Sequence, residues 1–542
     1  MEHFLAVLEQ QIKQQWDKPA LSNYHGKTFT HHDVAVEIAK LHLIFERLGV
    51  QKGDKVAIAA RNSAQWAIAF LATEAYHAVA VPILADFTPD NIQALTNHSE
   101  SVFLFTDKQP FKSMATESMP TVRAIVCCED FSLLYAPEDD TCELFTHVEE
   151  YYNETYPHGL APDCVHYPIC EPEELVLINY TSGTSGNPKG VMLPARSIDS
   201  NITFAQDNDP HQEGDNTLCI LPLGHMYGLV FEFLHTFLCG SHIYFLTKMP
   251  SPTILLKAFA EIRPYILITV PLVIEKIIKN KVQPILDRPV MRLLTRIPCL
   301  SHLIYRGIHK GFMQALGGKI RLIPIGGAAM NPEVEHIVMK AHIPATIGYG
   351  MTECGPLIGY EAPDKFVAGS CGKVVDRMEI RVASDDPCHT PGELQVRGMN
   401  VTTGYFKNEE ATRNAFTEDG WFHTGDLGII DKNGNIFIKG RSKFMILSSN
   451  GQNIYPEEIE SLLNNHPSVS ESLVVGREKQ LVAIITLTKE AAEEGNRQAL
   501  LSGIQAEMNA QLPPYSRISA IEVLEGDFEH TPKHSIKRHL YK

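Results

Sequence analysis

The sequence predicts an α/β protein in which doubly wound sheets form a large N-terminal domain and a small α+β domain follows. Helical and strand patterns alternate from Thr30 onward, which is typical of a parallel sheet covered by helices on both faces. Short strand patterns with frequent turns replace this alternation over residues 369–440 and predict a β-rich subdomain. With 542 residues, the chain exceeds the roughly 250–300 residues that one hydrophobic core supports. We therefore place the large domain at 1–440 and the small domain at 441–542.

Each predicted element depends on hydrophobic periodicity and on the residues that begin or end it. In the first part of the large domain, the pattern predicts helices over 31–48, 63–77 and 88–98, and strands over 55–60, 79–83, 101–105 and 175–178. Residues 107–172 show little periodicity, so we expect loops and short strands there.

The alternation continues in the second part of the large domain. Strands are expected over 217–221, 242–245, 266–270, 320–325 and 345–349, and helices up to about 238, over 252–262 and over much of 273–316. Asn331 and Pro332 favour the cap and first turn of a further helix. The pair Asn433-Gly434 predicts a hairpin in the β-rich subdomain. The small domain is expected to hold helices over 456–465 and 497–511 and strands over 472–475, 481–487 and 520–524.

Composition narrows the class of protein. The chain carries 47 basic and 64 acidic residues, a net charge of −17, which argues against general nucleic-acid binding. Its eleven cysteines include no Cys-x-x-Cys pair, so we expect reduced thiols in a cytoplasmic protein rather than a zinc site or disulfides. The N-terminus does not resemble a signal peptide, and no apolar stretch is long enough to span a bilayer. Contact with a membrane surface stays open.

The most informative stretch follows the strand predicted at 175–178. It contains Thr181, Ser182, Gly183, Thr184, Ser185, Gly186 and Lys189. Glycines let backbone N–H groups converge on one point, hydroxyls add donors and the lysine adds positive charge, so the loop suits a polyphosphate. It is not a Walker A loop, because Gly190 follows Lys189 where that motif has Ser or Thr. A solvent loop rich in turn residues is the alternative.

The order of residues in this loop closely resembles the signature of the adenylate-forming superfamily, which includes acyl-CoA synthetases, luciferases and peptide-synthetase adenylation domains. In layout and in its tail, the chain looks most like bacterial long-chain fatty acyl-CoA synthetases. Two positions, Ser185 and Phe444, depart from the commonest family residues, and the first of them preserves a hydroxyl.

Residues 349–353 resemble the second nucleotide block of that superfamily. The resemblance implies that Tyr349 stacks on adenine beside Gly350, that Thr352 contacts the phosphates and that Glu353 helps to hold Mg²⁺. Mg²⁺ prefers oxygen ligands and often takes one or two carboxylates with substrate phosphates. The alternative is a helix start with an acidic residue in its first turn.

Two further blocks resemble the ribose site and the acyl site. The resemblance implies that Asp426 and Arg441 hold the ribose hydroxyls and that Lys443 lies at the hinge between the domains. A turn aspartate and ordinary surface charge are the alternatives. The loop with Gly327 and Ala328 would bring adenine and the acyl group close to the backbone.

A histidine and two segments of the small domain complete the candidate site. The resemblance implies that His225 lines the acyl channel, although a lone histidine is more often structural. It also implies that Lys537 is the catalytic lysine of a mobile small domain. Ile536 replaces the glycine that many members carry there, which leaves Lys533 as an alternative and a basic surface tail as a third reading. Gly451, in the loop 448–452, is expected to line the thiol tunnel, because a bulky residue would narrow it.

The expected function is a two-step ligase reaction with ATP, Mg²⁺ and coenzyme A. A carboxylate attacks the α-phosphate, pyrophosphate leaves, and a thiol then displaces AMP from the acyl-adenylate. The acid is expected to be a long- or medium-chain fatty acid. An aromatic acid, transfer to a carrier protein, and a non-catalytic nucleotide-binding protein on the same scaffold are the alternatives, and a homodimer stays open.

Overall fold

The computed structural model describes residues 1–138, 140–181, 188–247, 251–447, 453–477, 480–493, 496–530 and 536–541. The chain forms two compact units. Unit 1 comprises Met1–Ala368, Gly372–Glu379 and Arg397–Gly420, and unit 2 comprises Gly369–Cys371, Ile380–Val396 and Trp421–Lys542. Unit 2 therefore combines much of the predicted β-rich subdomain with the C-terminal residues, and a division at residue 440 stays a prediction. Among the described residues, no helix has both the length and the apolar character that a membrane span requires.

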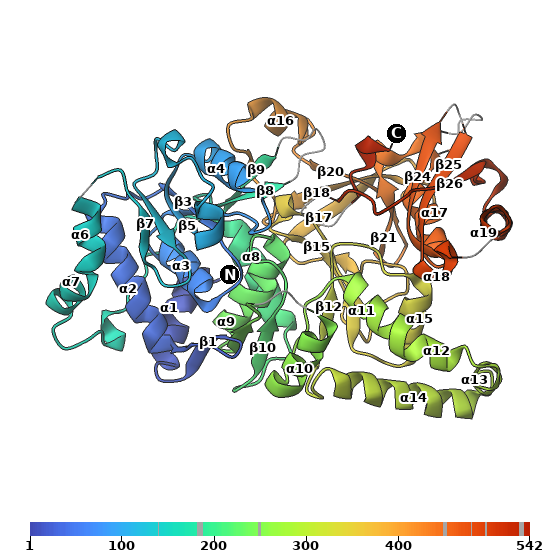
Figure 1. Ribbon diagram of the computed structural model, residues 1–542, viewed down its shortest axis with the longest axis horizontal. Helices are drawn as coiled ribbons and strands as arrows, with labels where there is room; N and C mark the ends of the chain where they lie inside the picture. The colour runs from blue at the N-terminus through green and yellow to red at the C-terminus, as the bar shows by residue number, and fades with distance from the viewer. Residues whose placement is uncertain are drawn as a thin grey trace. The chain divides into compact units, whose positions relative to one another are not determined.

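An eight-stranded sheet forms the first layer of unit 1, in the order β19-β9-β8-β4-β3-β5-β6-β7. Its strands are β3 (Lys55–Ala59), β4 (Val79–Pro82), β5 (Ser101–Thr106), β6 (Ala124–Cys127), β7 (Leu133–Tyr135), β8 (Leu175–Thr181), β9 (Lys189–Pro194) and β19 (Gly404–Tyr405). The five central strands, from β8 to β6, run parallel, as the βα alternation predicts. The helices of this part are α1 (Phe4–Gln14), α2 (His31–Arg47), α3 (Ala64–Ala75), α4 (Pro89–His98), α5 (Lys108–Phe111), α6 (Asp140–Thr146), α7 (Val148–Thr155) and α16 (Glu409–Asn414) (Figure 1).

A second sheet of unit 1 joins strands from distant parts of the chain, in the order β10-β11-β1-β2. Its strands are β1 (Pro19–Asn23), β2 (Thr28–Thr30), β10 (Asn216–Cys219) and β11 (His242–Phe245). Single bridges through Ile266 and Thr269 connect it to the parallel pair β12 (Ile323–Ile325) and β13 (Ala345–Ile347). A small antiparallel sheet follows, with β14 (Tyr349–Gly350), β15 (Leu357–Tyr360) and β16 (Lys373–Val374).

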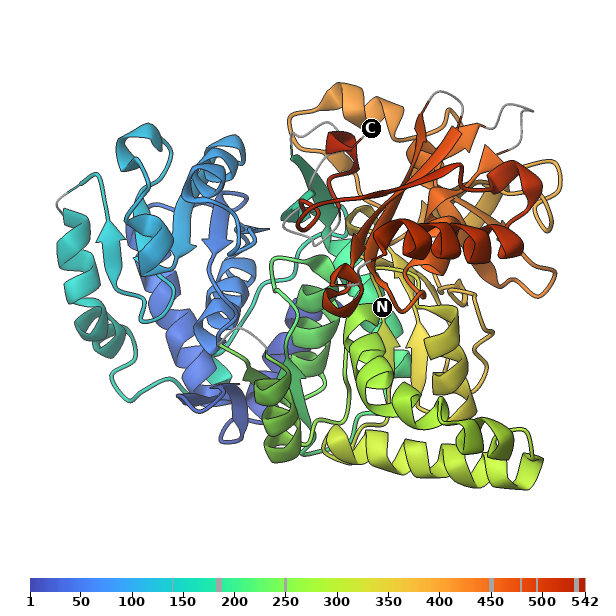
Figure 2. The same cartoon turned by 45° about the vertical axis from the view of Figure 1, so that its right-hand side comes forward.

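The helices around the second sheet include two π-helices. They are α8 (Ala195–Asn208), the π-helix Gly228–His235, α9 (Thr236–Leu238), α10 (Pro252–Ile262), α11 (Pro271–Ile277), the π-helix Ile278–Val282, α12 (Gln283–Leu286), α13 (Pro289–Leu294), α14 (Pro298–Ala315) and α15 (Pro332–Lys340). Helices α12, α13 and α14 lie together along one edge of unit 1 in both views (Figures 1 and 2).

Unit 2 contains an antiparallel sheet in the order β17-β18-β20-β21 and a second sheet, β24-β25-β26. Its elements are β17 (Met378–Ala383), β18 (Gly392–Gly398), β20 (Phe422–Ile430), β21 (Ile436–Arg441), β22 (Ile446–Leu447), β23 (Asn453–Ile454), α17 (Pro456–Leu463), β24 (Val469–Arg477), β25 (Gln480–Leu487), α18 (Lys489–Ala492), α19 (Arg497–Gln511) and β26 (Ala520–Val523). Helices α17 and α19 bury Ile459, Leu463, Ile504 and Met508 against the second sheet.

Most predicted elements are confirmed, and the differences have local causes. Residues 107–172 hold helices α6 and α7, not only loops and short strands; α7 buries one side chain, Tyr152, so its hydrophobic pattern is weak. Residues 266–270 form isolated bridges instead of a full strand. Asn331 caps α15 as expected, because its side chain accepts from the backbone N–H groups of Glu333 and Val334.

A buried glutamate connects the π-helix Gly228–His235 to the end of β10. Glu232 Oε2 accepts a hydrogen bond from the backbone N–H of Leu221 at 2.8 Å, and the Cys219 thiol lies 3.2 Å from the same oxygen. Burial raises the pKa of Glu232 to about 8, above its usual value of 4.5. This contact fixes the start of the segment that carries His225.

We expect stability to fall with rising pH because of this carboxyl group. The folded chain keeps a proton on Glu232 that the unfolded chain releases, so stability present near pH 4.5 is lost as the pH rises to about 8, at roughly 1.4 kcal/mol per pH unit. In Glu232→Gln the side chain stays uncharged at every pH. The thermal midpoint of this variant minus that of the natural protein should therefore be larger at pH 8 than at pH 5. Exposed Glu154→Gln is the matched control, and equal pH profiles for both variants would contradict the prediction.

Candidate active site

The β8–β9 hairpin positions the two described ends of the predicted phosphate loop. Thr181 and Lys189 are directly opposite each other in the antiparallel register. The side-chain amide of Asn179 donates to the Gly224 carbonyl at 2.9 Å, which connects β8 to the turn that carries half-buried His225. The predicted residues Ser182, Gly183, Thr184, Ser185 and Gly186 lie outside the described residues.

Lys189 and Glu353 are brought together by a tyrosine that the sequence reasoning missed. Tyr405 lies in β19, which pairs with β9 opposite Val191. The Lys189 ammonium lies 4.8 Å from the centroid of the Tyr405 ring, and the Tyr405 hydroxyl donates to Glu353 Oε1 at 3.0 Å. Burial, reinforced by the charge of Glu353, raises the pKa of Tyr405, so its hydroxyl stays a donor. A buried, fixed carboxylate beside a cation suits a magnesium–phosphate group.

Two glycines in the predicted nucleotide blocks allow close contacts that a side chain would prevent. A Cβ atom on Gly350 would collide with the Pro356 carbonyl oxygen, and one on Gly326 would lie 3.0 Å from the Tyr227 ring. Tyr349 is buried, whereas Gly327 and Ala328 are exposed on the loop after β12. The predicted adenine loop is thus accessible, and Tyr227 packs beneath it.

A cavity of about 60 Å³ lies behind the loops after β12 and β13. It is lined by Phe204, Ala205, Asn208, Asp209, Tyr227, Phe231, His235, Ile266, Ile268, Leu322, Pro324, Gly348, Leu357 and Tyr360. Most of this wall is apolar or aromatic. Because Gly348 precedes Tyr349 and Pro324 lies in β12, the cavity adjoins the predicted nucleotide blocks.

Asp209 and His235 form a buried pair in the cavity wall. His235 Nε2 lies 2.6 Å from Asp209 Oδ2, and the Tyr265 hydroxyl donates to the same oxygen at 2.7 Å. Burial opposes both charges, yet the hydrogen bonds from His235 and Tyr265 lower the pKa of Asp209. The pKa of His235 is raised, because the neighbouring Cys239 and Asp209 outweigh the effect of burial. Asp209 Oδ1 is buried and has no hydrogen-bond partner among the described residues.

In unit 2, the predicted ribose residues contact each other. Asp426 and Arg441 are opposite in the β20–β21 register, and Arg441 Nε lies 2.8 Å from Asp426 Oδ1. The Asp431–Asn435 turn sets this register, since the Gly434 N–H donates to the Asp431 carbonyl. The Arg441 guanidinium also donates to the Thr424 carbonyl at 3.2 Å. Two side chains that could each bind a hydroxyl are therefore held together.

Phe444 connects the junction to the C-terminal tail. Lys443 Nζ lies 4.7 Å and the Arg538 guanidinium 4.6 Å from the Phe444 ring centroid. Arg538 also donates to both carboxylate oxygens of Glu460, at 2.5 and 2.9 Å. Burial, with help from the charge of Arg441, lowers the pKa of Lys443.

Lys537 directly precedes this fixed arginine. Its ammonium lies 3.2 Å from Glu529, and its side chain is 36% exposed. A lysine in this setting is able to exchange its carboxylate partner for another anion. The alternative lysine, Lys533, and the predicted tunnel residue Gly451 lie outside the described residues.

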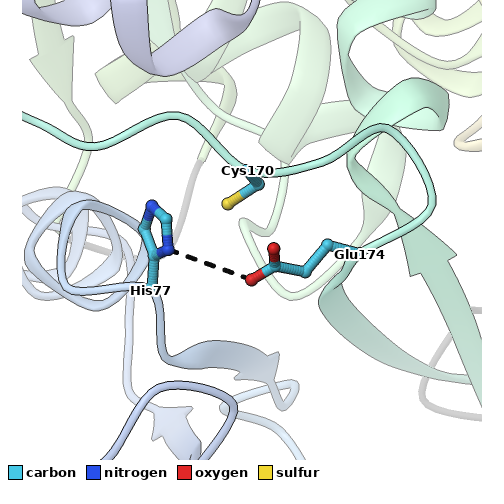
Figure 3. Close-up of side chains that lie close together, drawn as sticks. All are labelled: His77, Cys170 and Glu174. Carbon is cyan, nitrogen blue, oxygen red and sulfur yellow. Dashed lines mark ion pairs between the residues drawn. The ribbon is translucent and has the colours of Figure 1, made fainter.

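A cluster of potential metal ligands lies in unit 1 outside this site. His77, Cys170 and Glu174 face one another, with His77 Nδ1 3.9 Å from Glu174 Oε1 (Figure 3). Lys52 Nζ already lies 2.9 Å from Glu174 Oε2. Burial, with the carboxylates of Glu74 and Glu174, raises the pKa of Cys170 to about 12, so the thiol stays protonated. We interpret the cluster as a polar connection that holds the segment before β8.

Comparison with known proteins extends these observations. The family model described as AMP-binding enzyme matches residues 8–406, and that of the AMP-binding enzyme C-terminal domain matches residues 444–542. The long-chain-fatty-acid–CoA ligase FadD15 of Mycobacterium bovis is 30% identical over 488 residues, covering 84% of this chain and 76% of that protein. The 4-coumarate–CoA ligase 1 of Arabidopsis thaliana is 28% identical over 502 residues, covering 90% of this chain and 81% of that protein. The solved structure of the O-succinylbenzoate–CoA synthetase MenE of Bacillus subtilis, with ATP and a magnesium ion, has a TM-score of 0.75 at 23% identity and covers 98% of each chain.

The contact between Tyr405 and Glu353 makes a specific prediction. Tyr405→Phe keeps the ring beneath Lys189 but removes the donor to the carboxylate, a hydrogen bond to a charged group worth about 1.5–3 kcal/mol. We expect the affinity for magnesium–ATP, measured by calorimetry, to fall about tenfold. Tyr135→Phe, at a half-buried tyrosine in β7, is the matched control. Unchanged affinity in both variants would show that Tyr405 does not hold Glu353 for the metal.

Proposed function

We propose that this chain, which belongs to the AMP-binding enzyme family and is an AMP-forming acid–CoA ligase, activates a fatty acid of medium chain length. The membership confirms the resemblance predicted from the sequence. Ligases of this kind use ATP, Mg²⁺ and CoA. A cytoplasmic location is part of the proposal. It is supported by the eleven cysteines, all of which are free thiols, because the cytoplasm keeps thiols reduced.

The cavity behind the nucleotide blocks is the observation that carries the choice of acid. Its apolar and aromatic wall suits a hydrocarbon chain. Its volume of about 60 Å³ is well below the roughly 300–1,000 Å³ that holds drug-sized ligands, so any acyl chain must widen the cavity, and a medium chain requires less widening than a long one. A role of the protein in fatty-acid metabolism follows if its substrate is a fatty acid.

An aromatic acid is the second candidate. Phe204, Tyr227, Phe231 and Tyr360 line the cavity, and flat rings pack well against aromatic side chains. The relatives include both a long-chain-fatty-acid–CoA ligase and a 4-coumarate–CoA ligase. Sequence similarity to them therefore does not decide between a fatty acid and an aromatic acid as the substrate.

The candidate residues have distinct proposed roles in the first step. Lys189 and the loop from Thr181 hold the phosphates, Glu353 and Thr352 hold the metal and phosphates, and Tyr349 packs against adenine. Asp426 and Arg441 bind the ribose. A carboxylate oxygen of the acid then bonds to the α-phosphorus, the bond to the leaving pyrophosphate breaks, and Lys537 stabilises the charge that develops.

The second step transfers the acyl group. The CoA thiolate bonds to the acyl carbon and AMP leaves with the electron pair of the broken bond. Gly451 lines the path of the thiol in this proposal. An enzyme that transfers the acyl group to a carrier protein would use the same first step. A purely nucleotide-binding protein would carry out neither step.

Acid-dependent exchange of labelled pyrophosphate into ATP tests the choice of acid. Without CoA, we expect exchange with acids of medium length to exceed exchange with acetate and with oleate. Preference for 4-coumarate would establish the aromatic candidate instead. Exchange with no acid in the panel would contradict both.

Replacement of the proposed lysine tests its role. Lys537→Ala should lower the exchange rate at least a hundredfold, because a preorganised charge in the transition state is lost. Formation of acyl-CoA from supplied acyl-adenylate should change little. Lys432→Ala, at an exposed hairpin position of the same unit, is the control. Normal exchange in Lys537→Ala together with loss in Lys533→Ala would move the role to Lys533.

A further inference from the structure

One edge of unit 1 carries a charge opposite to that of the chain as a whole. Residues 271–319 contain nine Lys and Arg but only two acidic side chains, although the chain has a net charge of −17. These residues include α12, α13 and α14, which lie along the edge of the unit in both views (Figures 1 and 2). An anionic partner would be attracted to this edge and repelled from much of the remaining surface.

The tip of this edge exposes large apolar side chains between arginines. In and beside α13, Val290 is 66% exposed, Leu293 63% and Ile297 41%. The arginines interleaved with them are Arg288, Arg292 and Arg296, all exposed. Single exposed apolar residues are common, but several together beside basic residues mark an interaction surface.

A cationic pocket lies on the same edge, between α14 and the end of α15. It has a volume of about 190 Å³ and is lined by His302, Arg306, His309, Lys340, Ala341 and His342. The first three are spaced four and three residues apart and therefore share one face of α14. His309 Nδ1–H donates to the Ala341 carbonyl at 3.1 Å, which holds the two helices together.

The two strongest cations of the pocket are available to an anion. Within the described part of the chain, neither Arg306 nor Lys340 takes part in an ion pair. An arginine, a lysine and the imidazoles of His302 and His342 around one space form a set of donors that fits a phosphate group. The N–H of a neutral His309 ring is already used on the Ala341 carbonyl.

We propose that this edge docks on a membrane that contains anionic phospholipids. The arginines of the α13 tip face the headgroups, Val290, Leu293 and Ile297 enter the boundary between headgroups and acyl chains, and the pocket around Arg306 receives a lipid phosphate. Surface-bound segments of soluble proteins combine an apolar face with basic residues in this way. The mixture favours a lipid surface over nucleic acid, which would not require the apolar tip.

Vesicle flotation of the 542-residue chain tests the proposal. Vesicles of phosphatidylcholine with one third phosphatidylglycerol should bind the protein at low ionic strength, and vesicles of phosphatidylcholine alone should bind it much less. Neutralising the tip in Arg288→Gln, Arg292→Gln and Arg296→Gln together should lower partitioning on the order of a hundredfold, about fivefold per arginine. Val290→Ser with Leu293→Ser should weaken binding without changing its dependence on salt.

The pocket and the tip are tested separately. Arg306→Ala should weaken binding to the anionic vesicles while the apolar tip remains. The matched control, Ile169→Ser with Lys112→Glu, changes an exposed apolar and an exposed basic residue elsewhere in unit 1 and should bind as the natural protein does.

Three outcomes would overturn the proposal. They are equal binding to both kinds of vesicle, full binding by the triple arginine variant, and binding of soluble glycerol 3-phosphate at the pocket without binding of vesicles. Acid-dependent pyrophosphate exchange should persist in all of these variants, because none of the changed residues lies in the candidate active site. Loss of vesicle binding is therefore distinguishable from loss of activity.

Discussion

The connected set Lys189, Tyr405 and Glu353 is the constraint on which the proposed phosphate site of unit 1 depends. These residues come from strand β9, strand β19 and the 3₁₀-helix Thr352–Cys354 after β14, so three segments of the chain meet at one phenol ring. The ring supports a cation on its face, and its hydroxyl supports a carboxylate. A buried carboxylate is costly unless a donor satisfies it, and a cation on an aromatic face is held without neutralising the carboxylate. The arrangement keeps both charges available for a ligand that carries a metal and phosphates.

Local sequence patterns explain most elements of the fold but only part of the site. The helix cap at Asn331 and the hairpin at Asn433-Gly434 follow from rules that act over a few residues, and the structure confirms both. Asp426 and Arg441 could be named from motif order, but their direct contact requires the register that the hairpin imposes. Tyr405 was missed because its role comes from the pairing of β19 with β9, more than two hundred residues earlier. No periodicity or short motif reports such a pairing.

If the cavity holds the acyl group as proposed, its wall places a physical limit on that group. A hydrocarbon chain would satisfy the aromatic and aliphatic residues, but the charged pair of Asp209 and His235 also lies in this wall. An ion pair in an apolar environment persists because its partners bond to each other and to Tyr265. Among the described residues, the remaining oxygen of Asp209 has no hydrogen-bond partner, which costs free energy as long as only hydrocarbon faces it. Under the proposed function, acyl groups that end before this pair, or that bring a donor to it, would therefore bind better than long saturated chains.

The contacts of the C-terminal tail support the proposed role of Lys537 as the catalytic lysine. Electrostatic stabilisation of a transition state requires a charge held in place before the reaction, since reorientation during the reaction would consume the benefit. Arg538 is fixed by two hydrogen bonds to Glu460 and by its contact with Phe444, so the backbone one residue earlier is fixed as well. The Lys537 backbone N–H also donates to the Glu529 carbonyl at 2.8 Å, while in the described part of the chain its ammonium has a single exposed carboxylate partner. A fixed backbone with an exchangeable side-chain partner is the combination that a lysine needs to deliver its charge to a phosphate.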